Sequence, residues 1–410
     1  MPRPHSRLHV VGGGLAGLAA ALAGSRAGWA VEVWEASPGF GGRCRSFVDP
    51  VLGRRVDNGN HLLLAGNRAA MRHLAETGGD RAVRLAPARF PCLDLESGER
   101  WEVGVPNGGV GFPPRPSLPP GVAGGGLLRD LGRLWRLKGD APLGDALPEG
   151  PARRLLWDPL VRAVMNMDPD EAAAPPFRRA LGEILARGPG GLRPVLFPRG
   201  LAAALVDPAL DTLRARGAGL HPGRRVVGLD LGRERALGLG TRGGTVALAA
   251  GDALVVALPP SGAAALLPGL AVPEGHSPIL GAHFALDAPR LPVPFMGLVG
   301  GTAEWLFQHE GVLSATVSAA GAADDAALPA RLWADAARAL GCEGAPPPPA
   351  RLVREKAATF RQTPAGEALR PPARTRWRNV ALAGDWTRTG LPATIEGALR
   401  SGASAVRALG

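Results

Sequence analysis

The alternation of hydrophobic and polar positions in the first sixty residues predicts a strand, a helix and a second strand. The apolar run at 8–11 is short enough for a buried strand. Residues 15–27 are rich in alanine and leucine, which favour a helix. Residues 30–34 alternate as a strand does and are followed by Glu35. Two strands joined by a helix in this way form a parallel pair.

The turn between the first strand and the helix suits a phosphate group. Gly12, Gly14 and Gly17 fit the spacing G-x-G-x-x-G, in which the glycines allow a tight turn, backbone approach to a pyrophosphate and close helix packing. The helix N-terminus offers N–H groups and a positive dipole end, and Glu35 can accept hydrogen bonds from a ribose. The sequence therefore predicts a dinucleotide site that contains Gly12, Gly14, Leu15, Ala16, Gly17, Glu35 and Ala36.

Further along the chain, the pattern predicts two interleaved units. Helices are expected at 62–77 and 127–138, a hairpin at 90–105, an irregular connection at 106–126, strands at 224–231, 245–248, 253–260, 283–286, 297–299, 305–307 and 379–385, and a final helix entered through 391–398. The predicted class is α/β, with a Rossmann-type unit interleaved with an α+β substrate domain whose first insertion is mainly helical. We assign residues 1–65, 190–260 and 375–410 to the first unit, and residues 66–189 and 261–374 to the second.

Composition limits the environment and partners of the protein. The chain has 410 residues, 46% of them hydrophobic, and a net charge of +11 that is carried almost wholly by arginine. No nucleic-acid-binding motif accompanies this charge, so we expect no nucleic acid partner. No signal peptide and no spanning apolar segment are expected. Three scattered cysteines suit a reducing cytoplasm and exclude an ordinary zinc cluster, so no metal site is expected.

Two motifs after Glu35 resemble those of the large superfamily of FAD-dependent amine oxidases and phytoene desaturases. Residues 41–46 read Gly-Gly-Arg-Cys-Arg-Ser and match the G-G-R-x-x-S segment of that superfamily, and residues 57–59 match its D-x-G motif. The resemblance implies that FAD is the cofactor. It places Gly42 and Arg43 along the pyrophosphate, and Gly59, Asn60 and His61 toward the flavin.

The second half of the chain carries further parts of the same resemblance. Val226 matches a valine whose backbone contacts the adenine side of FAD. The pair Gly384-Asp385 at a strand end corresponds to the ribityl phosphate region. The start of the last helix, at Thr394 and Ile395, is expected to direct its dipole at the flavin pyrimidine ring.

Over nearly its whole length, the chain resembles one branch of that superfamily, the squalene-associated FAD-dependent desaturases, also called hydroxysqualene dehydroxylases, of bacterial hopanoid synthesis. The resemblance implies that an allylic C–OH in a C30 isoprenoid is replaced by C–H, which requires an acid for the departing hydroxyl. His61, protonated with help from Asp57, is the first candidate acid, although it can equally be a cofactor contact. Asn166 is a candidate hydrogen-bond partner for a substrate oxygen. Alternatively, a water molecule bound to Asn166 could be the acid.

Three other functions remain open at this stage. A carotenoid-type desaturase would use the same fold with hydride flow from substrate to flavin. An amine oxidase usually has an aromatic residue where this chain has Thr394, and the chain contains no tyrosine. A non-enzymatic prenyl-lipid binding protein would not need complete FAD motifs. No motif identifies the electron donor.

The segment at 127–138 bears on localisation. As a helix, it places Leu127, Leu128, Leu131, Leu134 and Trp135 on one face, with Arg129, Arg133 and Arg136 opposite. This pattern is typical of a surface helix whose apolar stripe lies in the core, or of a helix that lies on an anionic bilayer. With an isoprenoid lipid as substrate, we expect a cytoplasmic protein that is peripheral to the inner membrane.

Overall fold

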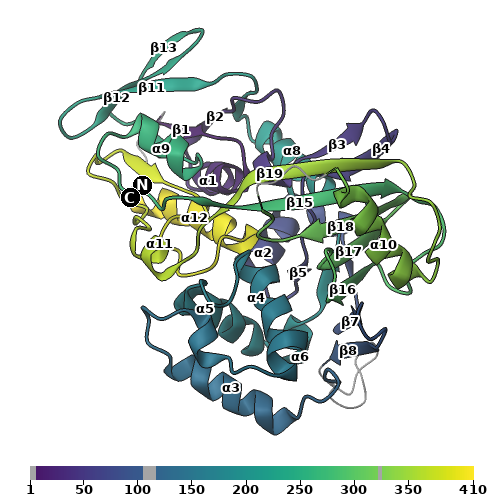
Figure 1. The fold of residues 1–410 in the computed structure, drawn as a ribbon. Helices are drawn as coiled ribbons and strands as arrows, with labels where there is room; N and C mark the ends of the chain where they lie inside the picture. Colours follow the sequence, from purple (N-terminus) through teal and green to yellow (C-terminus); the bar gives the residue numbers. More distant parts are fainter. Residues whose placement is uncertain (1–5, 105–116, 322–325) are drawn as a thin grey trace.

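A computed structural model describes residues 6–104, 117–321 and 326–410, and Figure 1 shows two sheet-based units with a helical insertion below them. The first unit is built on a five-stranded sheet in which all neighbouring strands are parallel. In spatial order its strands are β10 (Gly219–His221), β2 (Ala30–Trp34), β1 (Arg7–Val11), β14 (Ala253–Val256) and β20 (Val380–Leu382). The predicted Rossmann-type unit is thereby confirmed, with strands contributed from three distant stretches of the chain.

The strand β1 lies at the centre of this sheet because its apolar side chains are buried. Val10 is opposite Val33 on one side and Val255 on the other, and all three are fully buried. Central parallel strands are covered on both faces, which explains why they are continuous apolar runs in the sequence.

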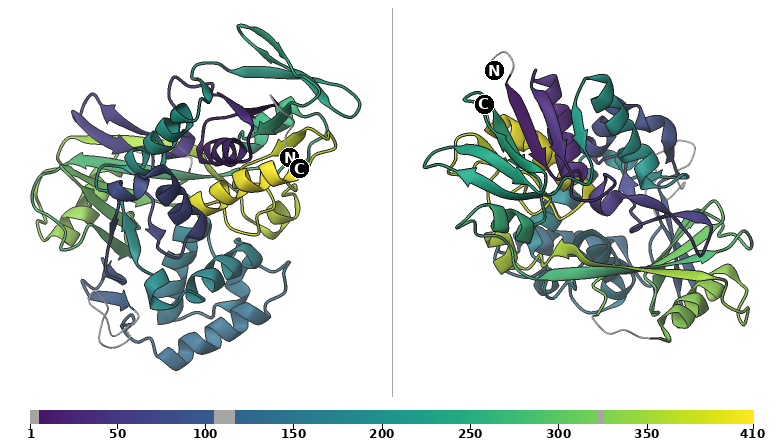
Figure 2. Two further views of the ribbon diagram at one scale, coloured as in Figure 1. Left: turned by 180° about the vertical axis from the view of Figure 1, so that it is seen from behind. Right: turned by 90° about the horizontal axis from the view of Figure 1, so that it is seen from above.

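The two ends of the chain meet on one face of this sheet. The helix α1 (Leu15–Arg26) lies beside α12 (Ile395–Ala408), as Figure 2 shows from behind. A β-carbon on Gly402 of α12 would lie 2.3 Å from the carbonyl oxygen of Ala16. This glycine therefore allows the two helix backbones to approach closely.

Further helices extend the same core. α2 (Arg68–Thr77), α7 (Leu201–Leu205) and α8 (Asp207–Ala215) contribute buried residues to it, among them Leu74, Leu205 and Leu213. The helix predicted at 62–77 begins at Arg68, because residues Leu63–Leu64 form β5, which pairs with β9 (Pro194–Leu196).

Smaller elements near this unit are β3 (Ser46–Asp49), β4 (Arg54–Asp57), β6 (Arg84–Leu85), α9 (Pro260–Leu266), α11 (Pro364–Ala368) and the 3₁₀ turns η1 (Gly42–Cys44) and η2 (Gly79–Ala82).

A separate antiparallel sheet lies beside the first unit. It consists of β11 (Val226–Leu231), β12 (Ala236–Thr241) and β13 (Gly244–Ala247). The first and third strands were predicted, whereas β12 was not. Its sequence alternates apolar residues with Gly238 and Gly240, and glycine weakens the strand signal.

The second unit is a seven-stranded sheet. In spatial order its strands are β19 (Ala350–Phe360), β15 (His276–Ala285), β18 (Val312–Val317), β17 (Trp305–His309), β16 (Phe295–Val299), β7 (Arg89–Asp94) and β8 (Arg100–Gly104). The hairpin predicted at 90–105 is present as β7 and β8. α10 (Leu328–Leu340) covers the sheet through Leu332, Trp333 and Ala336.

The insertion between β8 and β9 is helical, as predicted. It contains α3 (Gly124–Arg136), η3 (Leu143–Ala146), a π-turn η4 (Arg153–Trp157), α4 (Asp158–Met165), α5 (Ala174–Leu185) and α6 (Gly188–Gly191). Of the irregular connection expected at 106–126, positions 106–116 lie outside the described residues, and α3 already begins at Gly124. Within the described ranges, no helix has the length and apolar character needed to span a bilayer.

Candidate functional site

The glycine turn after β1 leaves an open space at the start of α1. Gly12 has a φ of 109°, and a β-carbon on it would lie 2.4 Å from the carbonyl oxygen of Ala257. Gly17 is equally constrained, since its β-carbon would lie 1.9 Å from the carbonyl oxygen of Gly12. Gly14 differs, because a β-carbon there would meet only Gly42, at 3.9 Å. Gly12 and Gly17 thus shape the turn, whereas Gly14 faces free space.

The residues at this turn are arranged as a phosphate and ribose site requires. α1 begins at Leu15 without a side-chain cap and without an acidic residue in its first turn. The Glu35 carboxylate accepts hydrogen bonds from the backbone N–H of Gly13 and of Ser37, each at 2.7 Å. Because each carboxylate oxygen has two lone pairs, these bonds orient Glu35 and leave acceptor capacity for a ribose hydroxyl.

Arg43 connects three distant parts of the chain. Positive φ angles at Gly41 and Gly42, 107° and 56°, turn the backbone into η1. The Arg43 guanidinium then lies 2.8 Å from a carboxylate oxygen of Asp385 and donates to the carbonyl oxygen of Ala358 at the end of β19. The Asp385 carboxylate raises the pKa of Arg43. Two residues that the sequence places 342 positions apart therefore form one ion pair.

The loop after β20 is organised by Arg370, which sequence analysis did not single out. Its side chain is 1% exposed and pairs with Glu367. It also donates to three backbone carbonyl oxygens of the loop, those of Asp385, Thr387 and Leu391. A buried arginine with several carbonyl acceptors fixes the loop that carries Asp385. In a chain this rich in arginine, no local pattern distinguishes it.

The last predicted cofactor-binding motif, at Thr394 and Ile395, lies at the start of α12. The Thr394 hydroxyl accepts a hydrogen bond from the backbone N–H of Gly397 at 3.2 Å, which makes Thr394 the N-cap. Glu396 is buried and accepts hydrogen bonds from the backbone N–H groups of Ala69 and Ala70 at the start of α2. The neighbouring Ile395 is buried in the core of the first unit. This glutamate thus joins two helix N-termini.

The surroundings of His61 oppose the expected protonation of its ring. Burial, with a contribution from the nearby Arg43 guanidinium, lowers the pKa of His61 to about 4. Only about 0.1% of such a group is protonated at pH 7. Its Nδ1 lies 2.9 Å from the backbone oxygen of Asn60, and a carbonyl only accepts, so Nδ1 carries the proton and Nε2 is the acceptor. The neutral ring cannot serve as a proton donor through Nε2.

The Asp57 carboxylate, which was predicted to favour the protonation of His61, has other partners in the structure. It accepts hydrogen bonds from the Ser46 hydroxyl and, at 3.0 Å, from the backbone N–H of Leu201. It therefore caps the N-terminus of α7. Burial raises the pKa of Asp57, while its hydrogen bond with Ser46 and the nearby His309 act in the opposite direction. The D-x-G aspartate is a structural residue in this chain.

The Asn166 side chain, the second candidate catalytic residue, has protein partners on three sides. It is 4% exposed, has a φ of 51° and ends α4. Its amide donates to the Ser277 carbonyl oxygen at 2.8 Å and to the Thr359 hydroxyl at 3.1 Å. Its side-chain oxygen accepts the backbone N–H of Ala319 at 2.7 Å. Both N–H groups of its side-chain amide thus have protein acceptors, which disfavours the expected bond to a substrate oxygen.

The other predicted residues lie as follows. Val226 starts β11 and is buried against the same core as Val11 and Leu254. A β-carbon on Gly59 would meet nothing within 4 Å, so this glycine, like Gly14, faces free space. The Asn60 amide nitrogen donates to the Thr316 hydroxyl at 3.0 Å, while its buried side-chain oxygen has no protein partner among the described residues.

One further polar group lies beside this cluster. Glu355 on β19 accepts a hydrogen bond from the Asn58 side chain at 3.0 Å and lies close enough to raise the pKa of Arg43. No strand was predicted at the residues of β19, and no motif distinguishes Glu355 from the charged residues around it. The open glycines, the uncapped helix start and the orphaned Asn60 oxygen together fit a bound dinucleotide such as FAD.

Comparison with known proteins defines the class of this chain. Residues 185–410 match the family described as flavin containing amine oxidoreductase, and residues 10–77 match the NAD(P)-binding Rossmann-like domain. The fold is similar to that of cyclohexylamine oxidase from Brevibacterium oxydans, with a TM-score of 0.72 and 17% identity over 99% of both chains. It is also similar to an oxidoreductase from Methanosarcina mazei, with a TM-score of 0.73 and 16% identity over 98% of this chain and 100% of the other. The chain is therefore an FAD-dependent oxidoreductase of the amine oxidase superfamily.

Curated relatives narrow this class further. The hydroxysqualene dehydroxylase of Rhodopseudomonas palustris is 41% identical over 96% of both chains. Those of Sinorhizobium fredii and Zymomonas mobilis are 38% and 36% identical, over 96% and 97% of both chains. The chain belongs to the hydroxysqualene dehydroxylases.

Proposed function

We propose that this protein reduces hydroxysqualene to squalene. The relatives that share 36–41% identity over nearly their whole length carry this proposal. In the reaction the allylic C–O bond breaks and a C–H bond forms, while the hydroxyl leaves as water. The carbon gains a hydride, and the departing hydroxyl gains a proton. Reduced FAD counted as FADH2 would account for both, so FADH2 and hydroxysqualene balance FAD, squalene and water. Carotenoid-type desaturation has no support beyond the shared fold.

The chain's own residues would bind the cofactor and position the substrate. Bound FAD would supply the electron pair as a hydride. The open backbone at Gly14 admits its pyrophosphate, and Glu35 accepts from the adenosine ribose. At the other end we place Gly59 and His61 near the reacting hydroxyl, where neutral His61 accepts that hydroxyl's hydrogen bond at Nε2 and orients it.

Product analysis under reducing conditions tests this proposal. The holoenzyme is photoreduced without oxygen and incubated with hydroxysqualene or with phytoene, and the products are identified by mass. We expect one squalene per reduced flavin and unchanged phytoene. Unchanged hydroxysqualene would contradict the proposal, and oxidation of phytoene by the oxidised enzyme would assign the desaturase reaction instead. Enzyme that has not been photoreduced is the control.

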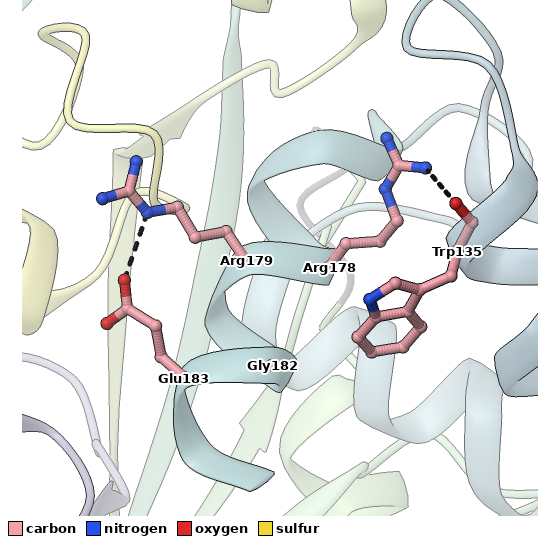
Figure 3. Close-up of a pocket in the computed structure, with 5 residues that line it drawn as sticks. All are labelled: Trp135, Arg178, Arg179, Gly182 and Glu183. Carbon is pink, nitrogen blue, oxygen red and sulfur yellow. Dashed lines mark hydrogen bonds and ion pairs between the residues drawn. The ribbon is translucent and has the colours of Figure 1, made fainter. Parts of the chain in front are cut away.

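We further propose that the protein contacts the membrane through α3. The structure divides the apolar stripe of this helix: Leu134 is fully buried, whereas Leu128 and Trp135 are 71% and 48% exposed. Arg129 and Arg136 are also exposed and lie one helical position after these two residues. Figure 3 shows Trp135 beside Arg178 on α5, and its ring lies near Gly182. Exposed apolar and basic side chains on one helix favour an anionic bilayer surface.

Vesicle sedimentation tests this surface. The variant Leu128→Ser/Trp135→Ser should lose binding to phosphatidylglycerol vesicles, and Arg129→Glu, Arg133→Glu and Arg136→Glu together should weaken it. Arg133 is the least informative of the three, because it already pairs with buried Asp130. Unchanged sedimentation of both variants would show that α3 is an ordinary surface helix.

A further inference from the structure

A second hollow of the molecule lies away from the glycine turn, on the outer side of α1 and α12. It is a groove of about 630 Å³ between α1, α2, α12 and the end of α5. Its charged lining residues are Arg26, Arg68, Arg72, Glu76, Arg179, Glu183, Arg187, Arg388, Arg400 and Arg407. Eight arginines and two glutamates leave a formal charge of +6. The reaction proposed above uses none of these residues.

The acidic residues of the groove cannot neutralise this charge. Glu76 already pairs with Arg26 and with Arg216, and Glu183 pairs with Arg179 and Arg400. These pairs distribute two negative charges over four arginines. The remaining positive charge is therefore uncompensated by the groove itself.

Five arginines of the groove have no carboxylate partner within the described ranges. Arg388 and Arg407 donate to the Arg370 carbonyl oxygen and the Ser404 hydroxyl, and the other three are Arg68, Arg72 and Arg187. Arg68 and Arg72 lie one turn apart on α2, and Arg187 lies just after the end of α5. All three side chains are exposed. The N–H groups at the start of α2 are already capped by Glu396, so guanidinium groups and not a helix terminus would bind a ligand here.

We propose that this groove binds the phosphate groups of an anionic ligand. Guanidinium groups form paired hydrogen bonds with phosphate oxygens, and a concave surface of one charge concentrates an ion of the other. A lipid headgroup and a soluble phosphorylated compound share this chemistry. One observation favours a lipid headgroup. Arg179 and Glu183 line both this groove and the hollow beside Trp135 on the proposed membrane-contacting helix (Figure 3). A bound phosphate would also bridge α5 of the insertion to the helices of the first unit. The site does not depend on the proposed reaction.

Binding of inorganic diphosphate to the FAD-loaded protein tests the site directly. Calorimetry should show binding that weakens with salt, and the thermal midpoint should rise. In Arg68→Glu/Arg72→Glu/Arg187→Glu the formal charge of the groove falls from +6 to zero, and affinity should fall more than about tenfold. The matched control Arg233→Glu/Arg242→Glu/Arg290→Glu makes the same change of net charge at exposed sites elsewhere and should bind as the parent does. Flavin absorbance and the thermal midpoint without ligand establish that both variants are folded.

Absence of binding to the parent protein, or equal loss in the groove and control variants, would overturn the proposal. Vesicles of phosphatidylglycerol then distinguish the two sources. Loss of vesicle binding in the groove variant but not in the control supports a lipid headgroup, and unchanged vesicle binding together with lost diphosphate binding supports a soluble ligand. The Leu128→Ser/Trp135→Ser variant should keep its diphosphate affinity, which separates this site from the α3 surface.

Discussion

At the scale of single residues, surroundings decide what a motif residue can do. His61 and Asp57 both lie in a recognisable motif, yet the surroundings of half-buried His61 lower its pKa, and Asp57 is used as a helix cap. Gly12 and Gly14 belong to the same turn, but only Gly14 opens onto free space. A motif thus indicates where a site is, and the contacts of each residue decide its part in it.

The state of His61 predicts a flat pH dependence. In a single turnover of the reduced enzyme, His61→Gln and the parent should show parallel profiles of rate between pH 5.5 and 8.5, because a group with a pKa of about 4 stays neutral throughout. A general acid would instead make the parent lose rate as the pH rises through its pKa. It would also make the variant about 10²–10⁴-fold slower. A descending limb present in the parent alone would contradict our assignment.

Gly14→Val should remove FAD without disturbing the fold. Gly14 has a φ of −75°, which valine adopts readily, so the added side chain conflicts only with a ligand in the open space. We expect FAD affinity to fall more than about tenfold, or ~1.4 kcal/mol. The ratio of flavin absorbance to protein after gel filtration measures this. Gly39→Val, at an exposed glycine with nothing within 4 Å, is the matched control and should keep its flavin.

At the scale of elements, side-chain hydrogen bonds join units that the chain pattern treats separately. Asn166 ends α4 and connects the helical insertion to β15, β19 and Ala319, two positions after β18. Glu396 connects α12 to α2, and Arg370 holds the loop between β20 and α12. Each of these polar side chains is buried, and each has partners that lie more than ten residues away.

The Asn166 connection predicts a loss of stability and not of substrate binding. Asn166→Gly keeps the backbone conformation but leaves buried partners on Ser277 and Ala319 unpaired, which should cost about 2–4 kcal/mol. Asn166→Ala should cost about 1 kcal/mol more, because of its positive φ. Thermal unfolding measures both. KM for hydroxysqualene, measured well below the midpoint, should be unchanged, and a raised KM in a fully folded variant would restore the substrate contact.

At the scale of the whole molecule, the site exists only where the two ends of the chain meet. The Arg43–Asp385 ion pair closes across 342 residues, and α1 lies against α12 through Gly402. Cofactor binding should therefore depend on a helix contact that lies away from the glycine turn.

Gly402→Leu tests this dependence. A leucine there would overlap the backbone of Ala16 and Ala20, which lie 2.3 and 2.7 Å from a β-carbon, and would force α1 and α12 apart. Overpacking of this kind costs about 1–3 kcal/mol, and FAD should be released at lower temperature. Ser404→Leu, on the half-buried side of the same helix, should release flavin as the parent does. Equal release temperatures for the two variants would show that the site does not depend on the helix contact.

The sequence alone determined the parts of this protein that local physics controls. Apolar runs of strand length, the glycine spacing and the acid after β2 specify the Rossmann-type unit, because burial and turn geometry act over a few residues. The FAD motifs at both ends identified the superfamily and its branch. Tertiary structure decided the rest. The protonation of His61, the commitment of Asn166 and Asp57, and the roles of Arg370 and Glu355 depend on neighbours that are distant in sequence. The division of the α3 stripe depends on which residues α5 covers. The basic groove exists because three helices of the first unit and one of the insertion bring arginines to one surface. Charge of this kind has no periodicity that a sequence pattern reveals.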